Sequence, residues 1–430
     1  MARSPHQTTA VRARPDPLDG HRPLGVTPRP MTAPYEGFRR VHPSALPVTG
    51  AWRPGDPVGR RRFLALADDR PFALEGGGLL RGVTVAFETW GTLSPTADNA
   101  VLVCHALTGD SHAAGGLVPG HVTPGWWDGA VGPGLAIDAD RWFVVCANVL
   151  GGCQGTLGPA SPHPDDGRPW ASRFPVVTIR DMVRTQAAVA NHLGIDRWAL
   201  VVGGSMGGMQ VLEWGVMYPE RVGALVPIAT AAAASAQQIG WWSSGRRCIR
   251  MDPRWRGGEY YDAEAKNKPH DGLATARMIS MMTFRSDDVF SARFGREVVE
   301  PVEGYSLWQR FQVERYLEYQ GDKLVRRFDA NSYLLLTKAM DLHDLGRGRG
   351  GPEAAFARMR APVLSIGINS DILYPPHQSR EIVDVARRAG VDAVYAEMDS
   401  PHGHDAFLIE SDQLATLLRP FIARLEAAGA

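Results

Sequence analysis

Short hydrophobic runs alternate along the chain with longer segments in which hydrophobic residues recur at helical spacing. This alternation is typical of a mostly parallel sheet with helices on both faces. The runs that predict strands are residues 83–90, 99–107, 142–150, 198–204, 361–370 and 392–398. The pattern therefore predicts the α/β fold class.

A change of pattern divides this fold. From about residue 235 to 345 no run predicts a strand, whereas helical periodicity is frequent. We therefore expect an inserted helical segment, residues 235–345, between two parts of an α/β core, residues 41–234 and 346–430. The segments with helical spacing are 179–195 and 411–426 in the core and 273–284, 306–320 and 331–345 in the insertion.

The first 40 residues differ from the rest in composition. They are rich in arginine and proline, contain no apolar segment like that of a signal peptide, and hold too many prolines for an amphipathic helix. We interpret residues 1–40 as a disordered tail. Their shortage of acidic residues leaves an organellar transit peptide as the alternative.

Charge and hydropathy exclude two classes of partner. The 46 lysines and arginines balance the 46 aspartates and glutamates, so no overall charge attracts nucleic acid or an anionic membrane. The longest apolar stretch, residues 224–234, is too short to cross a bilayer and contains Pro227. We expect neither a nucleic-acid partner nor a membrane partner.

The four cysteines form no CxxC pair and are too few for a disulfide scaffold. Free thiols in a reducing compartment are therefore expected, and we predict a cytoplasmic protein. The same spacing argues against a zinc site, and we predict no bound metal.

The most informative short stretch is VVGGSMGGMQ, residues 201–210. Gly203, Ser205 and Gly207 fit the pattern G-x-S-x-G, in which a serine sits on a sharp strand-to-helix turn and glycines allow close packing. Glycine-rich turns also bind phosphate. However, the chain contains neither a GxGxxG after an early strand nor a GK[ST], so Ser205 is the candidate nucleophile.

A nucleophilic serine needs a histidine base and an acid, and in this fold the order along the chain is Ser, Asp or Glu, His. Asp371 ends a predicted strand, which favours it over Asp341 and Asp344, although it could also cap the turn that follows it. Two histidines, His402 and His404, lie between the last predicted strand and the last helix. The pattern alone leaves that choice open.

The tetrahedral intermediate needs backbone N–H donors, one from the residue after the nucleophile and one from the loop after an early strand. Met206 supplies the first. The loop at residues 104–112, CHALTGDSH, follows an apolar strand and is the expected source of the second.

Seven blocks in this order give the chain, from about residue 45 to its end, a resemblance to the homoserine O-acetyltransferases. They are HALTGDSHA (105–113), NVLGGCQGTLGPAS (148–161), SRFPVVTIRDMV (172–183), GGSMGGMQVLEW (203–214), DANSYLLLTKAMD (329–341), SDILYPP (370–376) and HGHDAFL (402–408). The resemblance implies an α/β-hydrolase fold with a helical lid. It also implies ping-pong transfer of an acyl group from acyl-CoA, through an acyl-serine, to the hydroxyl of an amino acid.

The resemblance also implies roles for residues. Ser205 is then the nucleophile, His404 the base and Asp371 the acid behind it, while the N–H groups of Leu107 and Met206 form the oxyanion hole.

Two further positions match residues that bind the amino acid. Arg277 would hold its carboxylate and Asp405 its ammonium, which suits the bidentate geometry of a guanidinium and the charge of a carboxylate. Arg277 could instead lie on a solvated helix face. Three further arginines, Arg246, Arg247 and Arg250, are candidates for the phosphates of acyl-CoA or for a solvated surface.

The expected function is transfer of acetyl from acetyl-CoA, as co-substrate, to L-homoserine, in methionine biosynthesis, by a homodimer joined through the lid and without a permanently bound cofactor. Phe284 stands where a tyrosine is usual, and Leu157 and Ala160 replace hydroxyl residues. These departures leave a succinyl donor and a serine acceptor as alternatives. An esterase and a non-catalytic binding module of the same fold also remain open.

Overall fold

A computed structural model describes residues 42–66, 70–300 and 306–427. The predicted tail, residues 1–40, lies outside the described residues.

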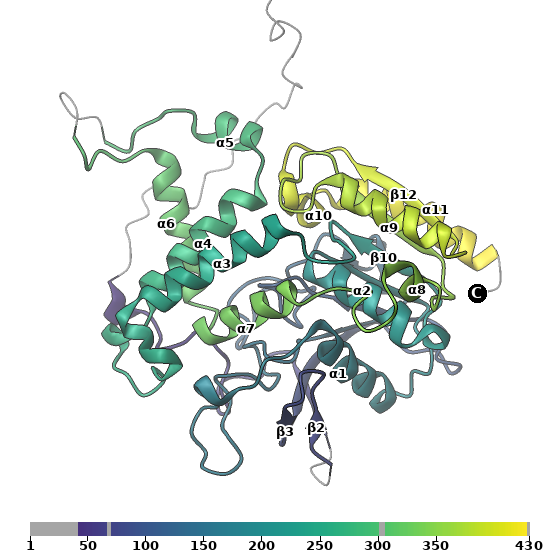
Figure 1. The fold of residues 1–430 in the computed structure, drawn as a ribbon, viewed down its shortest axis with the longest axis horizontal. Helices are drawn as coiled ribbons and strands as arrows, with labels where there is room; N and C mark the ends of the chain where they lie inside the picture. Colours follow the sequence, from purple (N-terminus) through teal and green to yellow (C-terminus); the bar gives the residue numbers. More distant parts are fainter. Residues whose placement is uncertain (1–41, 67–69, 301–305, 428–430) are drawn as a thin grey trace, which may run out of the picture. The chain divides into compact units, whose positions relative to one another are not determined.

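An eight-stranded sheet forms the centre of the described chain (Figure 1), in the order β1-β4-β8-β5-β9-β10-β11-β12. β1 and β4 run antiparallel to their neighbours, and every other pair in this sheet is parallel. The mostly parallel sheet is confirmed. Its strands are β1 (Arg62–Ala65), β4 (Thr84–Trp90), β5 (Ala100–Cys104), β8 (Phe143–Ala147), β9 (Leu200–Gly204), β10 (Leu225–Ile228), β11 (Val363–Ile368) and β12 (Ala393–Met398).

Two short strand pairs lie outside this sheet. They are β2 (Phe72–Ala73) with β3 (Leu79–Leu80), and β6 (Val131–Gly132) with β7 (Ile137–Asp138).

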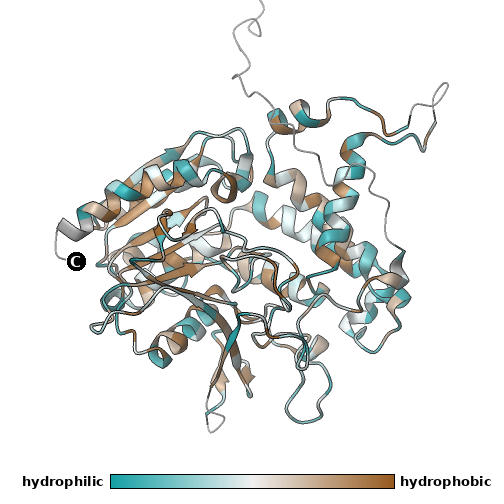
Figure 2. Ribbon diagram, turned by 180° about the vertical axis from the view of Figure 1, so that it is seen from behind, coloured by the Kyte–Doolittle hydropathy of each residue, from teal (hydrophilic) through white to brown (hydrophobic). Residues whose placement is uncertain are grey.

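Helices cover both faces of the sheet because successive side chains of a strand point to opposite sides. On β10, Leu225 packs against Gly215 of α2 (Met206–Met217). Its neighbour Val226 belongs to the core cluster that contains Leu414 of α11 (Ser411–Ala427). Figure 2 shows the strands as largely hydrophobic. The remaining core helices are α1 (Ile179–His192), α8 (Pro352–Phe356), α9 (Pro376–Arg388) and α10 (Ala406–Ile409).

Between β10 and β11 the chain forms a group of helices, which we call the helical insertion (residues 235–345). α4 packs against α3 and α6, and α3 packs against α7, and these helices lie to one side of the sheet in Figure 1. Over its described part, 235–300 and 306–345, the insertion contains no strand of two or more residues. The helices are α3 (Ala236–Met251), α4 (His270–Phe284), α5 (Asp287–Phe294), α6 (Gln312–Val325) and α7 (Ala330–Asp341).

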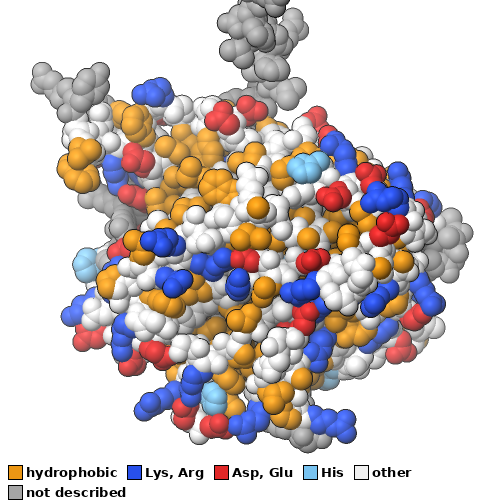
Figure 3. Space-filling model, in the orientation of Figure 1, with side chains coloured by type: hydrophobic (Ala, Val, Ile, Leu, Met, Phe, Trp, Pro, Cys, Tyr) orange, Lys and Arg blue, Asp and Glu red, His pale blue; other side chains and the backbone are white. Residues whose placement is uncertain are grey.

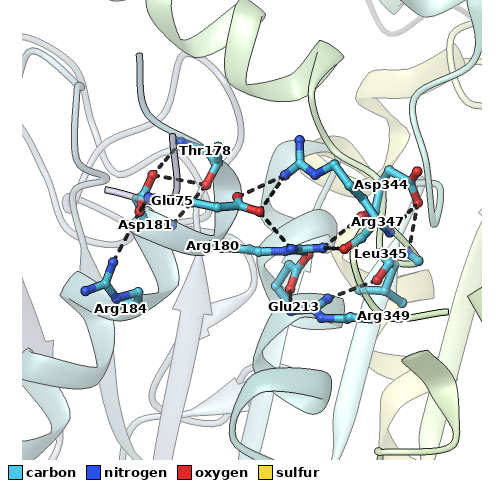
Figure 4. Close-up of polar contacts among 11 residues, drawn as sticks. Glu75, Thr178, Arg180, Asp181, Arg184, Glu213, Asp344, Leu345, Arg347 and Arg349 are labelled. Carbon is cyan, nitrogen blue, oxygen red and sulfur yellow. Dashed lines mark hydrogen bonds and ion pairs between the residues drawn. The ribbon is translucent and has the colours of Figure 1, made fainter. Parts of the chain in front are cut away.

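An ion-pair network fixes the chain where it leaves the helical insertion (Figure 4). Arg180 binds Glu75 at 2.7 Å and Glu213 at 3.0 Å. The returning chain adds Arg347, 2.9 Å from Glu75, and Arg349, 2.6 Å from Glu213. We call these five residues the anchoring network. It joins α1 and α2 to the segment before α8, so the end of the insertion is held on the core.

The surface charges and the hydropathy of the helices can be compared with the sequence. On the face drawn in Figure 3, basic and acidic side chains are interspersed. Within the described residues, no helix combines the length and the apolar character needed to cross a bilayer.

All four cysteines are free thiols, as the sequence predicts. Burial raises the pKa of Cys104, Cys146 and Cys153, so these thiols stay protonated and unreactive at neutral pH.

Candidate active site

Ser205 occupies a sharp turn between β9 and α2. Its backbone has φ 59° and ψ −123°, a conformation that non-glycine residues adopt only when the surroundings enforce it. Two bonds hold it there. The Ser205 N–H donates to the carbonyl of Ile228 at 2.9 Å, and the hydroxyl of Thr230 donates to the carbonyl of Ser205 at 2.9 Å. The strain therefore presents the serine at the end of β9, as in a nucleophile elbow.

The flanking glycines are required by close packing. A Cβ on Gly203 would lie 2.6 Å from the carbonyl oxygen of Cys104, and one on Gly204 would lie 2.5 Å from the ring of Phe407. Neither distance is tolerable for a side chain, so larger residues would push the elbow away from β5 or from α10.

The predicted acid and base lie together. His404 Nδ1 is 2.6 Å from Asp371 Oδ2, and both residues are 3% exposed. The other oxygen of Asp371 accepts bonds from the N–H groups of Leu373 and Tyr374, at 2.8 and 2.9 Å. Asp371 thus caps the turn after β11 and also holds the histidine, so the two roles considered for it coexist.

Two opposing effects act on His404. Burial disfavours the charged imidazole, but the charge of Asp371, the hydrogen bond with it and the charge of Asp405 together raise the pKa of His404 above its ordinary value of 6.5. A base of raised pKa accepts a proton more readily from an alcohol.

Ser205 and His404 share two neighbours. The ring of Tyr374 stacks on His404, with centroids 5.2 Å apart, and its side chain lies beside Ser205. The ring of Phe407 packs edge-on against His404 at 5.7 Å and limits the space at Gly204. In the described chain, no hydrogen bond joins Ser205 Oγ to His404 Nε2. Catalytic bonds of this kind are often formed only when substrate binds.

The two expected oxyanion donors lie on α2 and on the loop after β5. Met206 is the first residue of α2, and its N–H has no acceptor within the helix. Leu107 lies in the buried loop after β5. Sequence reasoning missed the residue that shapes this loop. His105 bonds through Nδ1 to the carbonyl of Ala106 at 2.8 Å and accepts the N–H of Val149 at Nε2, at 3.1 Å, which fixes one neutral tautomer.

Arg277 points inward from α4. Its Nη1 is buried and, within the described residues, has no hydrogen-bond partner. The guanidinium lies 5.2 Å from the ring centre of Phe284, and that ring is 5.8 Å from His404. Burial lowers the pKa of Arg277, while the charge of Asp405 opposes this effect. Arg277 is partly buried as a residue, and its Nη1 does not lie on a solvated face.

Asp405 follows the histidine in the 3₁₀ turn Gly403–Asp405. It forms an ion pair of 3.2 Å with Arg285, the residue after α4. The pair was not predicted from the sequence. His402, the other histidine of this loop, is 32% exposed at its side chain and lies 3.8 Å from Glu410.

One of the three arginines considered for CoA has another partner. Arg246 pairs with the buried carboxylate of Asp341, while Arg247 and Arg250 are exposed. Leu157 and Ala160, which depart from the usual pattern, are both buried.

Comparisons with known proteins decide the family. Residues 99–411 match a family model described as the alpha/beta hydrolase fold. The chain is 51% identical over 382 residues to a homoserine O-acetyltransferase of Thermobifida fusca, covering 88% of this chain and 98% of the relative. The chain belongs to the homoserine O-acetyltransferase family. A relative of the same description from Moorella thermoacetica is 51% identical over 352 residues, covering 82% and 93%. The resemblance inferred from the sequence is confirmed.

Solved structures extend this result. A homoserine O-acetyltransferase from Bacillus anthracis superimposes with a TM-score of 0.78 at 29% identity, covering 85% of this chain and 98% of the other. Esterase E22 gives 0.77 at 29% identity, covering 85% and 100%. The same backbone therefore occurs in a homoserine O-acetyltransferase and in an esterase, so the fold alone does not distinguish the two activities.

A second buried cluster in this family member consists of Glu88, His112 and His121. His112 Nδ1 is 2.8 Å from Glu88 Oε2, and His121 Nε2 is 3.4 Å from Glu88 Oε1. The two imidazoles are stacked, 3.8 Å apart and 11° from parallel. Imidazole lone pairs lie in the ring plane, and a zinc–nitrogen bond is about 2.0–2.1 Å, so two stacked rings cannot direct their lone pairs at one ion. The cluster fits a hydrogen-bonded network, in which Ser111 also donates to Glu88 at 2.9 Å.

Proposed function

We propose that this family member transfers an acetyl group from acetyl-CoA to the side-chain hydroxyl of L-homoserine. The observation that carries this proposal is the 2.6 Å bond between Asp371 and His404 beside the strained Ser205, in a chain about half identical to homoserine O-acetyltransferases over most of its length. The product would be O-acetyl-L-homoserine, an intermediate suited to methionine biosynthesis.

In the first half-reaction, Ser205 Oγ attacks the thioester carbonyl while His404 Nε2 takes the serine proton. Asp371 accepts the Nδ1–H of His404, which keeps Nε2 free as a base and stabilises the imidazolium. The N–H groups of Met206 and Leu107 stabilise the oxyanion. Collapse breaks the carbon–sulfur bond, and His404 returns the proton to the CoA thiolate. Acetyl-Ser205 and free CoA result.

The second half-reaction repeats these steps with another nucleophile. The hydroxyl of the acceptor attacks acetyl-Ser205, and His404 removes the hydroxyl proton. When the tetrahedral intermediate collapses, His404 gives that proton to Ser205 Oγ. The acetyl ester leaves and the enzyme is restored.

The acceptor would bind through its two charges. Arg277 has a buried nitrogen without a partner among the described residues, and a guanidinium binds a carboxylate through two parallel bonds. Asp405, one residue from the base, would bind the ammonium. Held by the carboxylate and the ammonium of its α-carbon, the acceptor would present its side-chain hydroxyl to acetyl-Ser205 in place of water.

The homodimer is part of the proposal. Large hydrophobic side chains of the helical insertion are exposed, Met251 by 68%, Met282 by 54%, Leu307 by 87% and Trp308 by 83%. In Figure 3 hydrophobic side chains gather over the part of the face where Figure 1 places α4 to α6. A second copy would cover such a surface. Light scattering should give about twice the mass of the chain.

The experiment is a matrix of acetyl-CoA and succinyl-CoA against L-homoserine and L-serine, with release of free CoA as the readout. Acetyl-CoA with L-homoserine should give the highest rate. Intact-protein mass spectrometry with acetyl-CoA alone should show one added acetyl group on the wild type and none on Ser205→Ala.

Two outcomes would replace the proposal. A rate that depends on L-serine or on succinyl-CoA would change the acceptor or the donor. Rapid hydrolysis of p-nitrophenyl acetate that no hydroxy amino acid accelerates would identify an esterase.

A further inference from the structure

The carboxylate proposed for the acceptor ammonium already has a partner. Arg285 Nη2 lies 3.2 Å from Asp405 Oδ2, and the two side chains are only 18% and 16% exposed. An ion pair at this depth is stronger than one on the surface, because water screens it less. The pairing therefore fixes the direction in which Asp405 points.

The backbones on both sides of this pair are also fixed. Gly403 has φ +66°, and a Cβ at this position would lie 2.8 Å from the carbonyl carbon of Arg285 and 2.8 Å from the nitrogen of Ser286. The hydroxyl of Ser286 donates to the carbonyl of Pro401. The end of α4 and the loop that carries the base thus meet without space between them, and Arg285 reaches Asp405 from a rigid position.

A second cation, Arg277, lies in the same region: its guanidinium is 5.2 Å from the ring centre of Phe284, and that ring is 5.8 Å from His404, the residue before Asp405. The charge of Asp405 is the largest of the effects that favour protonation of Arg277, and it acts against burial. Among the described residues no ion pair joins Arg277 to Asp405. If Asp405 were released, its carboxylate would turn toward Arg277, because a buried guanidinium without a partner is costly. In that contact Asp405 and Arg277 would neutralise each other, and neither charge would be available to bind a zwitterionic acceptor.

Resting on the proposed function, we propose that Arg285 is a positioning residue for the acceptor. It holds the Asp405 carboxylate away from Arg277 and so keeps a site for ammonium separate from a site for carboxylate. Arg285 acts through Asp405 and takes no part in forming acetyl-Ser205.

The test uses Arg285→Met in the full-length chain, with a melting curve to check folding. We expect the KM for L-homoserine to rise about tenfold and kcat at saturation to stay within about threefold. The burst of p-nitrophenol from p-nitrophenyl acetate, which needs no acceptor, should be unchanged. Arg285→Lys keeps a cation and should restore at least half of the loss on a logarithmic scale.

The matched control is Arg310→Met, which removes an ion pair of 2.7 Å with Glu318 elsewhere in the helical insertion and should leave KM unchanged. A double-mutant cycle supplies the decisive readout. In the Asp405→Asn background, Arg285→Met should add less than about a twofold change, because the carboxylate on which it acts is gone.

Contrary outcomes are distinct. A KM that is unchanged or lower in Arg285→Met, or effects of Arg285→Met and Asp405→Asn that simply multiply, would overturn the role of Arg285 while leaving the proposed function intact. A wild-type enzyme that no hydroxy amino acid accelerates would overturn the proposed function, and the acceptor role of Arg285 with it.

Discussion

Two regions at the borders of the helical insertion use charged groups in opposite ways. In the anchoring network, Arg180, Arg347 and Arg349 each pair with Glu75 or Glu213 at 2.6–3.0 Å. Where α4 meets the base-carrying loop, buried polar atoms lack partners among the described residues. Arg277 Nη1 is one of them. We call this second region, the residues Arg277, Asp371, Tyr374, His404 and Asp405, the catalytic junction.

The difference separates groups that stabilise the fold from groups reserved for substrate. Leaving a buried donor unsatisfied costs about 1–3 kcal/mol, so a chain selected for stability alone would pair these atoms, as it does in the anchoring network. In the catalytic junction the missing partner of Arg277 Nη1 would be the carboxylate of a bound zwitterion. Substitutions should therefore act mainly on stability in the first region and mainly on catalysis in the second.

The largest effect is expected for Asp371→Asn. The new amide would donate to His404 Nδ1, so the imidazole would carry its proton on Nε2 and could no longer accept one from Ser205. We expect kcat to fall about 10⁴-fold. Steady-state CoA release measures it, and a nearly unchanged melting temperature would place the effect in the chemistry. A loss smaller than tenfold would exclude Asp371 as the acid of the triad.

The matching change in the anchoring network is Glu213→Ala. It leaves Arg180 and Arg349 beside an empty position in a buried region, which should lower the free energy of unfolding by about 3–5 kcal/mol. Urea denaturation measures it, and kcat well below the melting temperature should stay within about twofold. Glu220→Ala, which removes an exposed pair with Arg360, is the control and should cost less than about 1 kcal/mol. Equal losses in the two variants would remove the contrast between the regions.

The third change, Arg277→Met, tests whether a residue of the catalytic junction can be replaced without loss of stability. A buried guanidinium with an unpaired nitrogen contributes little to folding, so stability should be equal or higher. The kcat/KM for L-homoserine should fall about 100-fold, because the carboxylate loses a bidentate partner. Calorimetry and initial rates supply the two readings. A clear loss of stability would mean that Arg277 supports the fold and is not reserved for substrate.

The smallest effect concerns pH. His404 must be neutral to act as a base, and its pKa is raised above 6.5, so kcat/KM should decline about tenfold per unit as pH falls below that raised pKa. Because the charge of Asp405 contributes to the increase, Asp405→Asn should move this acid limb to lower pH. If the acid limb of Asp405→Asn did not move, the charge of Asp405 would have no effect on the pKa of His404.

Much of the sheet could be predicted because its central strands are continuous hydrophobic runs. β10 was not recognised as a strand, since Pro227 lies within it and proline lacks the N–H that a ladder uses. The structure accommodates this proline where pairing with β11 is interrupted, between Leu225 and Ile228. α3 was also missed, because serines and glycines break its hydrophobic pattern.

The active site, like the sheet, could be predicted from the sequence only in part. Ser205, Asp371 and His404 could be proposed because a glycine pattern, the end of a strand and the chain order are local or sequential features. The pair of Arg285 and Asp405 joins residues 120 positions apart. Nothing in the sequence indicates which of many arginines faces that aspartate, because the contact depends on how α4 ends against the loop.

The close approach of Gly403 to the end of α4 couples the opening of the active site to the position of the His404 imidazole. Any movement that lifted α4 at this end would pull on the loop through the contact of Ser286 with Pro401 and would withdraw the imidazole from the elbow. An opened molecule would then be chemically idle, and water entering it would meet an acylated serine without its proton acceptor. Protection of the intermediate would come from the loss of the base as much as from a physical barrier.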